Sequence, residues 1–144
     1  MKILYQTEAT ATGGREGHVH SSDGRIDVEL ALPKELGGPG GPGTNPEQLF
    51  AAGFAGCFDN AMLLVARRMK LSTAGSRVTA RVGLGMFEAG RFGMDVELLV
   101  TLPELEQEEA ESLVHATHKV CPFSNAVAGN IDVKLTVAPP SDVL

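Results

Sequence analysis

Alternating hydrophobic and polar positions predict β-strands in several parts of this chain. In RIDVELALP (25–33) and in IDVKLTV (131–137) every second residue is apolar, which is typical of a strand that buries one face. Residues 77–102 predict a hairpin, because a further alternating stretch follows the turn residues Ala89-Gly90. The alternating positions are Ile26, Val28, Leu30, Leu32, Phe92, Met94, Val96, Leu98, Val100, Leu102, Ile131, Val133, Leu135 and Val137.

Two other stretches carry the signals of helices. Asn45 is a favourable N-cap, Pro46 suits the first helical position, and Gln48 stands where a capping box requires it. A helix is therefore expected from Asn45 to about Met69, and its residues are apolar on almost all sides. The acidic run ELEQEEAE predicts a second helix over 103–120, since carboxylates are favourable near a helix N-terminus.

These elements define a fold class. Strands are also expected at 2–10 and near 18–22, a Gly/Pro-rich loop at 37–44 and a tail at 138–144. The resulting order β-β-β-α-β-β-α-β is typical of an α+β fold with an antiparallel sheet and helices against it. The length of 144 residues suits a single domain, 1–144. Because a helix that is apolar almost all round needs cover on several sides, we expect an obligate homodimer.

Composition and charge narrow the choice of partners. The net charge of −6 and a pI near 5.1 disfavour nucleic acid and anionic membrane surfaces as partners. The apolar run 49–66 is interrupted by Asp59 and Asn60, which favours a buried helix over a membrane span. No basic segment precedes an apolar one at the N-terminus, and only two cysteines are present. We therefore expect a cytoplasmic protein with reduced thiols.

The two cysteines are the first candidates for chemistry. A cysteine in so apolar a helix is most often an inert core residue, because burial raises the pKa of its thiol. Cys57, however, has nearby glycines at 53 and 56, which leave room for another group to approach. Cys121 can simply end the second predicted helix. Alternatively, one sulfur reacts and the other resolves it as a disulfide, although the spacing alone does not bring them together.

A reactive thiolate needs a cation, and Arg15 is a candidate. The glycines of ATGGREG give its loop freedom to reach inward, although a solvated loop arginine is the simpler interpretation. Glu47 could pair with it bidentately, or could simply be a favourable charge at a helix N-terminus. Glu47 and Cys57 are ten residues apart, which is about 15 Å along a straight helix. Either the helix breaks at Gly53 or Gly56, or Arg15 and Glu47 act on the cysteine of a second subunit.

Three other functions are alternatives to thiol chemistry. His18-x-His20 and His115-x-x-His118 could bind zinc together with the cysteines, but no CxxC motif accompanies them. A thiol sensor or small-ligand carrier could use the same pocket; a sensor oxidises once, whereas a peroxidase turns over with added dithiol. An acyl-thioesterase is less favoured, because no well-placed carboxylate remains once Glu47 is tied to Arg15.

Three blocks of the sequence together resemble a known family. ATGGREG, NPEQLFAAGFAGCF and VCPFSNAVAGN match, in order, the organic hydroperoxide resistance (Ohr) branch of the OsmC/Ohr family, and the resemblance covers essentially the whole chain. The form VCPFSN favours Ohr over its osmotically induced OsmC sibling. The resemblance implies an OsmC-like fold, with antiparallel sheets wrapped around long central helices in an intertwined homodimer. Phe54 and Phe123 stand where relatives often have tyrosine.

The resemblance also implies a function and assigns roles to residues. It implies a thiol peroxidase acting on organic and fatty-acid hydroperoxides, with two active sites at the homodimer interface. It implies no bound cofactor and no metal, but an external dithiol reductant, dihydrolipoamide or a lipoylated protein. The peroxidatic and resolving cysteines of the family fall on Cys57 and Cys121, and its active-site arginine and glutamate on Arg15 and Glu47, which we expect to act in trans. An apolar substrate pocket is expected from Phe50, Phe54, Phe58, Met62 and Phe123.

Overall fold

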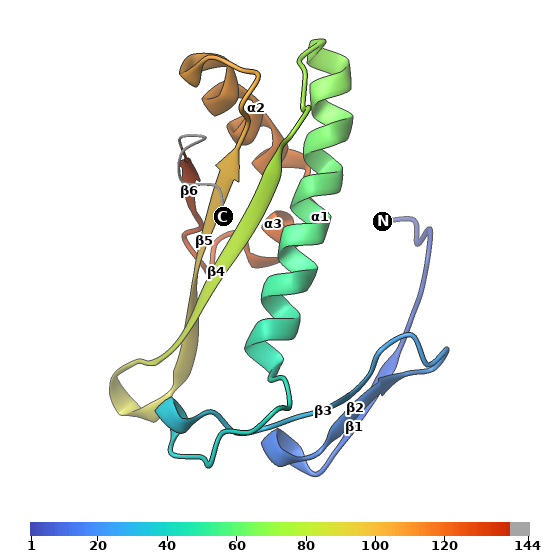
Figure 1. Cartoon of the computed structure of the whole chain (residues 1–144), viewed down its shortest axis with the longest axis vertical. Helices are drawn as coiled ribbons and strands as arrows, with labels where there is room; N and C mark the ends of the chain where they lie inside the picture. Colours follow the sequence, from blue (N-terminus) through green and yellow to red (C-terminus); the bar gives the residue numbers. More distant parts are fainter. Residues whose placement is uncertain (139–144) are drawn as a thin grey trace. The chain divides into compact units, whose positions relative to one another are not determined.

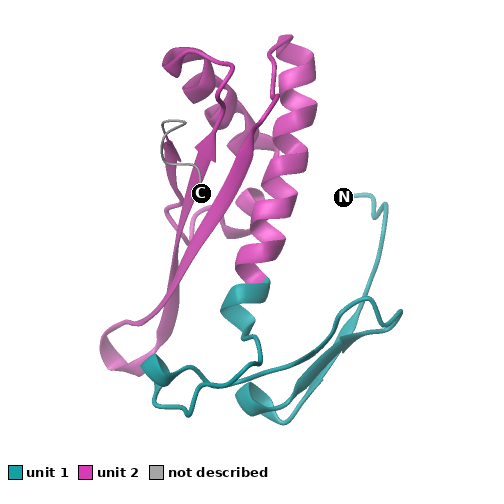
Figure 2. Ribbon diagram, in the orientation of Figure 1, with its two compact units in different colours: residues 1–49 teal, residues 50–144 magenta. Residues whose placement is uncertain are grey.

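The computed structural model describes residues 1–138 and divides into two compact units. Unit 1 is Met1–Leu49 and unit 2 begins at Phe50, as the two colours of Figure 2 show. The expected tail at 138–144 lies, apart from Ala138, outside the described residues. Each unit has a three-stranded sheet of its own, and together they give the mixed α+β content predicted from the sequence.

Unit 1 contains the antiparallel sheet β1-β2-β3. Its strands are β1 (Ala9–Thr12), β2 (His18–Ser21) and β3 (Asp27–Glu29), joined by a 3₁₀ turn, η1 (Gly14–Glu16), and followed by another, η2 (Lys34–Leu36). Strand β2 lies where it was expected. The expected first strand at 2–10 is wrong for most of its length, because only Ala9–Thr12 pair with β2 and a strand without a partner leaves its backbone groups unpaired.

Strand β3 is shorter than the predicted stretch 25–33. Only Asp27–Glu29 pair with β2, while Leu30 makes an isolated parallel bridge to Thr44. The predicted alternation is kept in part: Leu30 is buried and Val28 is half-buried, but Ile26 is exposed. The bridge joins the end of β3 to Thr44, immediately before the first long helix begins.

Helix α1 (Pro46–Met69) begins and ends where the sequence predicted. The Gln48 backbone N–H donates to the Asn45 Oδ1 at 2.8 Å, so Asn45 is the expected N-cap. The Gln48 side chain, however, accepts a hydrogen bond from the Thr44 hydroxyl at 2.7 Å. The Asn45 half of the predicted capping box is therefore confirmed, whereas the Gln48 side chain bonds Thr44.

Unit 2 contains a mixed sheet rather than the antiparallel one that was predicted. Strands β4 (Arg77–Met86) and β5 (Phe92–Thr101) form the expected hairpin, and Ala89 and Gly90 take positive φ at its turn (η3, Glu88–Gly90). Strand β6 (Lys134–Val137) pairs in parallel with β5. The reason is the helical crossover that separates them, which returns the chain to the same end of the sheet before β6 starts.

The crossover consists of two helices, of which only one was predicted. Helix α2 (Gln107–Val120) ends where expected but starts four residues later than Pro103, because residues 102–105 form a turn closed by the Leu105 N–H on the Leu102 carbonyl. Helix α3 (Pro122–Val127) follows after a single residue, Cys121. Its signal was the Cys121-Pro122 pair, since proline favours the first position of a helix.

The core of unit 2 lies between α1, the sheet and α2, and Figure 1 shows the β4–β5 hairpin running alongside α1. One face of α1 is buried in it, while Leu63, Leu64 and Met69 on other faces are exposed. Helix α1 is long and apolar enough to cross a membrane by length and composition alone, as core helices of soluble proteins also are. The buried members of the core are Phe54, Phe58, Ala61, Met62, Val65, Ala66, Val96, Leu98, Val100, Leu102, Ala110, Leu113, Val114 and Cys121.

Candidate active site

The structure brings the two cysteines together in unit 2. Cys57 lies half-buried on α1, and Cys121 is fully buried at the corner between α2 and α3. The two side chains are close enough for a hydrogen bond between their sulfurs, yet both are free thiols. The sequence spacing did not predict this contact, because it depends on how α2 packs against α1.

The surroundings of Cys57 act on its pKa in opposite directions. Burial raises the pKa of the thiol above its ordinary value, and the adjacent Cys121 raises it further. The Phe123 backbone N–H opposes both by donating a hydrogen bond to the sulfur, which favours the thiolate. Because burial is the largest of these effects, activation of Cys57 calls for an additional positive charge.

The start of α3 explains why the Phe123 N–H is free to donate. The first N–H groups of a helix have no partner inside it, and Pro122 at the first position has no N–H at all. The N–H of Phe123 can therefore point at the Cys57 sulfur. This main-chain donor was missed in the sequence, although the proline after Cys121 was its signal.

Gly53 allows α3 to approach α1 at this point. A Cβ on Gly53 would lie 3.2 Å from two atoms of the Phe123 ring, closer than ordinary contact. The Phe123 ring also packs against Phe50 and Phe54, with ring centroids 6.4 and 5.6 Å away. The expectation that glycines near Cys57 permit a close approach is thus confirmed for Gly53, whereas nothing lies within 4 Å of a Cβ on Gly56.

Unit 1 holds the predicted arginine and glutamate as a bidentate ion pair. The Arg15 Nη1 and Nη2 donate to the Glu47 Oε1 and Oε2 at 2.6 and 3.0 Å. Arg15 lies on η1, after Gly13 and Gly14 with positive φ, and Glu47 lies in the first turn of α1. The hydrogen bond from Arg15 holds the pKa of the Glu47 carboxyl below its usual range. The side chains are 35% and 19% exposed, so the pair is partly desolvated.

The course of α1 decides one of the alternatives left open by the sequence. The helix is continuous from Pro46 to Met69, so it does not break at Gly53 or Gly56. The ten-residue separation between Glu47 and Cys57 along the helix axis therefore stands.

The residues predicted to form a substrate pocket occupy different environments. Phe54, Phe58 and Met62 are fully buried in the core of unit 2, while Phe50 and Phe123 are partly buried against it. That these side chains bind substrate stays a prediction.

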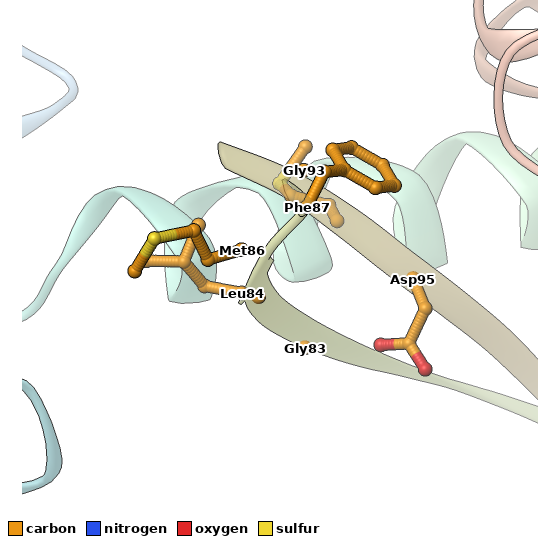
Figure 3. Close-up of a pocket in the computed structure, with 8 residues that line it drawn as sticks. Gly83, Leu84, Met86, Phe87, Gly93 and Asp95 are labelled. Atoms are coloured by element: carbon orange, nitrogen blue, oxygen red, sulfur yellow. The ribbon is translucent and has the colours of Figure 1, made fainter. Parts of the chain in front are cut away.

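A cavity of unit 2 lies elsewhere, at the tip of the β4–β5 hairpin. It has a volume of about 340 Å³, and Figure 3 shows the side chains around it. The Arg91 guanidinium lies 4.9 Å from the centre of the Phe87 ring. Met86, Phe87 and Phe92 at this tip are exposed, so the hairpin ends in an uncovered apolar surface. The cavity is lined by Gly83, Leu84, Gly85, Met86, Phe87, Gly93, Met94 and Asp95.

The histidines are occupied in local interactions. His18 pairs with Asp27 across β2 and β3 at 2.5 Å, and the His18 and His20 rings stack at 5.7 Å. The His115 Nδ1 lies 2.8 Å from the Glu111 carbonyl. Within residues 1–138, no three His, Cys, Asp or Glu side chains are grouped so that they could hold a metal ion.

The chain is similar in sequence and structure to proteins of one known family. The family model of the OsmC-like proteins matches residues 38–136. An organic hydroperoxide resistance protein of Xanthomonas axonopodis pv. citri (strain 306) is 53% identical over 138 residues, 95% of this chain and 96% of that protein.

Two crystal structures superimpose closely. An organic hydroperoxide resistance protein from Elizabethkingia anophelis has a TM-score of 0.90 at 51% identity, covering 96% of this chain and 99% of its own. The organic hydroperoxide resistance protein OhrB of Bacillus subtilis has a TM-score of 0.86 at 41% identity, covering 94% and 100%.

Proposed function

Because the chain belongs to the OsmC family, in its organic hydroperoxide resistance branch, we propose that it is a cysteine-based peroxidase. Its substrates are organic hydroperoxides, including those of fatty acids, which it reduces to alcohols, and its role is protection against oxidative stress. The observation that carries the proposal is the contact between two free thiols, Cys57 and Cys121. Such a pair can be oxidised to an internal disulfide and reduced again, a route that a lone buried cysteine lacks.

The proposed cycle has three steps. The Cys57 thiolate attacks the distal oxygen of the hydroperoxide, the O–O bond breaks, and the alkoxide leaves and takes a proton to become the alcohol. Cys57 is then a sulfenic acid. The Cys121 sulfur, after losing its proton, attacks the Cys57 sulfur, and hydroxide leaves as water while the disulfide forms. An external dithiol reduces the disulfide by two exchanges and becomes a cyclic disulfide itself.

Arg15 and Glu47 complete the site in this proposal. Arg15 supplies the positive charge that a buried thiolate needs, and Glu47 holds the guanidinium by two hydrogen bonds. We assign them to the Cys57 of the other subunit in a homodimer. The unbroken α1 supports this assignment, because it keeps Glu47 about 15 Å along the axis from Cys57 of the same chain. The exposed apolar residues of α1 and of the hairpin tip support a dimer that covers them.

The chemistry of the surroundings suggests the substrate class and the reductant. Phe123, whose N–H bonds Cys57, belongs to an aromatic cluster with Phe50 and Phe54. Such walls favour an apolar alkyl or acyl tail over the small, polar hydrogen peroxide. A lipoyl-type dithiol, dihydrolipoamide or a lipoylated protein, is the proposed reductant, because its two thiols can open a buried disulfide and close on themselves. The cycle is placed in the cytoplasm, where thiols stay reduced.

Peroxide consumption with added dihydrolipoamide tests the proposal. Wild-type protein should turn over an organic hydroperoxide repeatedly and hydrogen peroxide far more slowly. Cys57→Ser should lose all turnover, because it removes the reacting sulfur. The matched variant Cys121→Ser should still consume one equivalent of peroxide, since it keeps Cys57. A single stoichiometric oxidation of the wild-type protein, without turnover, would instead indicate a thiol sensor.

A further inference from the structure

A side-chain hydrogen bond joins the two helices on either side of Cys121. The His118 Nδ1, in the last turn of α2, lies 2.9 Å from the Ser124 Oγ, in the first turn of α3. Ser124 is only 2% exposed, and His118 is partly buried. The bond thus spans the corner at which the buried thiol of Cys121 is held.

The backbone of the corner is held by two hydrogen bonds of Cys121. Cys121 itself is in an extended conformation, with φ −65° and ψ 123°, and it ends α2 and caps α3 at once. Its N–H donates to the Thr117 carbonyl and its carbonyl accepts from the Asn125 N–H, at 2.9 and 3.0 Å. Each of these backbone bonds ties Cys121 to one helix. The His118–Ser124 bond ties the two helices to each other.

The protonation of His118 suits this bond. Burial, with a smaller contribution from the nearby His115, holds the pKa of His118 below its ordinary value, so the ring is neutral near pH 7. A neutral imidazole with its proton on Nε2 leaves Nδ1 as an acceptor. The Ser124 hydroxyl can therefore donate to it, which satisfies a buried hydroxyl that would otherwise be costly.

We propose that His118 and Ser124 are positioning residues for the resolving step. Their hydrogen bond fixes the angle between α2 and α3, and with it the place of the Cys121 sulfur beside Cys57. This inference rests on the proposed peroxidase cycle. It adds to that cycle the contact that sets the rate of disulfide formation. The step competes with a second molecule of peroxide, which converts the sulfenic acid irreversibly to a sulfinic acid. A loose corner would therefore make the protein easier to inactivate.

Two pairs of variants separate positioning from simple packing. His118→Leu and Ser124→Ala remove the hydrogen bond from either side. His118→Asn keeps an acceptor close to the position of Nδ1 and should restore much of the effect. His115→Leu is the matched control, because His115 lies one turn earlier on the same helix, bonds the Glu111 carbonyl and takes no part in the His118–Ser124 hydrogen bond.

The first measurement follows single turnovers with an organic hydroperoxide. Disulfide formation should slow by about fivefold to tenfold in His118→Leu and Ser124→Ala, the range expected for one lost hydrogen bond. This slowing should exceed any change in the rate of Cys57 oxidation, which α3 can affect only through the Phe123 N–H. Mass spectrometry should find more sulfinic acid at Cys57 in these two variants. Wild-type rates of disulfide formation in both, or equal slowing in His115→Leu, would overturn the proposal. If His118→Leu fails to fold, Ser124→Ala alone decides.

A second measurement uses no peroxide and so stands apart from the proposed function. Cys57 of the reduced protein is converted to a mixed disulfide with glutathione, and its resolution by Cys121 is timed. The same order of rates is expected, with Ser124→Ala slower than wild type and His118→Asn in between. The rates of the wild type and the variants could follow this order although the wild-type protein consumes no peroxide. The peroxidase function would then be wrong, and the positioning role would stand.

Discussion

At the scale of single residues, the candidate site depends on main-chain features as much as on side chains. The Phe123 N–H is the donor that the structure aims at Cys57, and Gly53 is the residue that lets it come close. The sequence identified both cysteines, Arg15 and Glu47 because each has a distinctive side chain. It did not identify the N–H donor, because every residue except proline carries one and only the fold gives it a direction.

Gly53→Ala should separate reactivity from stability. The new Cβ would press on the Phe123 ring at 3.2 Å and displace the N–H that bonds the Cys57 sulfur, so we expect slower oxidation of Cys57. Overpacking costs about 1 kcal/mol or more, and alanine stabilises a helix by about 1 kcal/mol relative to glycine, so the free energy of unfolding should change little. Gly56→Ala is the control, because its Cβ would meet nothing within 4 Å. Equal rates in both variants would contradict this role of Gly53.

The charge state of Cys57 should respond to Arg15. Burial already raises the pKa of the Cys57 thiol, and the proposed dimer supplies Arg15 as the compensating cation. Loss of a cation raises a thiol pKa further, so Arg15→Gln should shift the pH profile of Cys57 oxidation to higher pH. Arg25→Gln is the control, since Arg25 is exposed and pairs with Asp23 at 3.7 Å. An unchanged profile in Arg15→Gln would show that Arg15 does not act on the thiolate.

At the scale of elements, the sequence predicted reliably those features whose hydrogen bonds form between residues close together in the chain. The start of α1 was predicted to the residue, because Asn45 and Pro46 specify it without help from the rest of the fold. The strand expected at 2–10 failed because a strand depends on a neighbour that the sequence does not show. The parallel direction of β6 was missed for a related reason: strand alternation reports which face is buried, and says nothing of direction.

Asn45→Ala should measure the worth of the α1 cap. The substitution removes the acceptor of the Gln48 N–H and should lower the free energy of unfolding by about 1 kcal/mol. It also frees the turn that carries Glu47, so oxidation of Cys57 should slow in the dimer. Asn45→Asp keeps the acceptor and should leave both quantities close to wild type. Urea denaturation and peroxide kinetics check the two effects, and an unaltered midpoint in Asn45→Ala would show that the Asn45 cap does not contribute to stability.

At the scale of the whole molecule, the two units each hold different candidate residues. Unit 1 holds the cation and its carboxylate, and unit 2 holds both thiols. The family resemblance assigned roles to these residues, since no periodicity in the sequence relates Arg15 to Cys57, but the division into two units was not predicted. The dimer stays a proposal, and two measurements address it and the chemistry that it contains.

Mixed dimers should reveal whether the halves come from different chains. A heterodimer of Cys57→Ser and Arg15→Ala chains has one intact set of residues if Arg15 serves the partner, and none if it serves its own chain. We expect activity approaching half that of the wild-type dimer, and little in either parent homodimer. Tagged subunits purified together would provide the sample. A heterodimer no better than its parents would exclude sharing in trans.

Oxidation should make the protein harder to unfold. The Cys57–Cys121 disulfide would close a loop of about 64 residues, and restricting the unfolded chain in this way stabilises a protein by up to about 4 kcal/mol. The two thiols already touch in the reduced form, so the bond needs little rearrangement. Thermal unfolding of the oxidised and reduced protein, with Cys121→Ser as the control, should show a higher Tm only for the oxidised wild type. An equal or lower Tm would mean that the disulfide strains the fold.

The parallel pairing of β6 with β5 has a consequence for the synthesis of the chain. Cys57 leaves the ribosome well before Cys121, and the corner that holds Cys121 belongs to the crossover that β6 completes. Pairing between strands distant in sequence forms late in folding. In the proposed cycle, a growing chain therefore carries Cys57 without its resolving thiol, and it can close the disulfide only after the crossover and the last strand are in place.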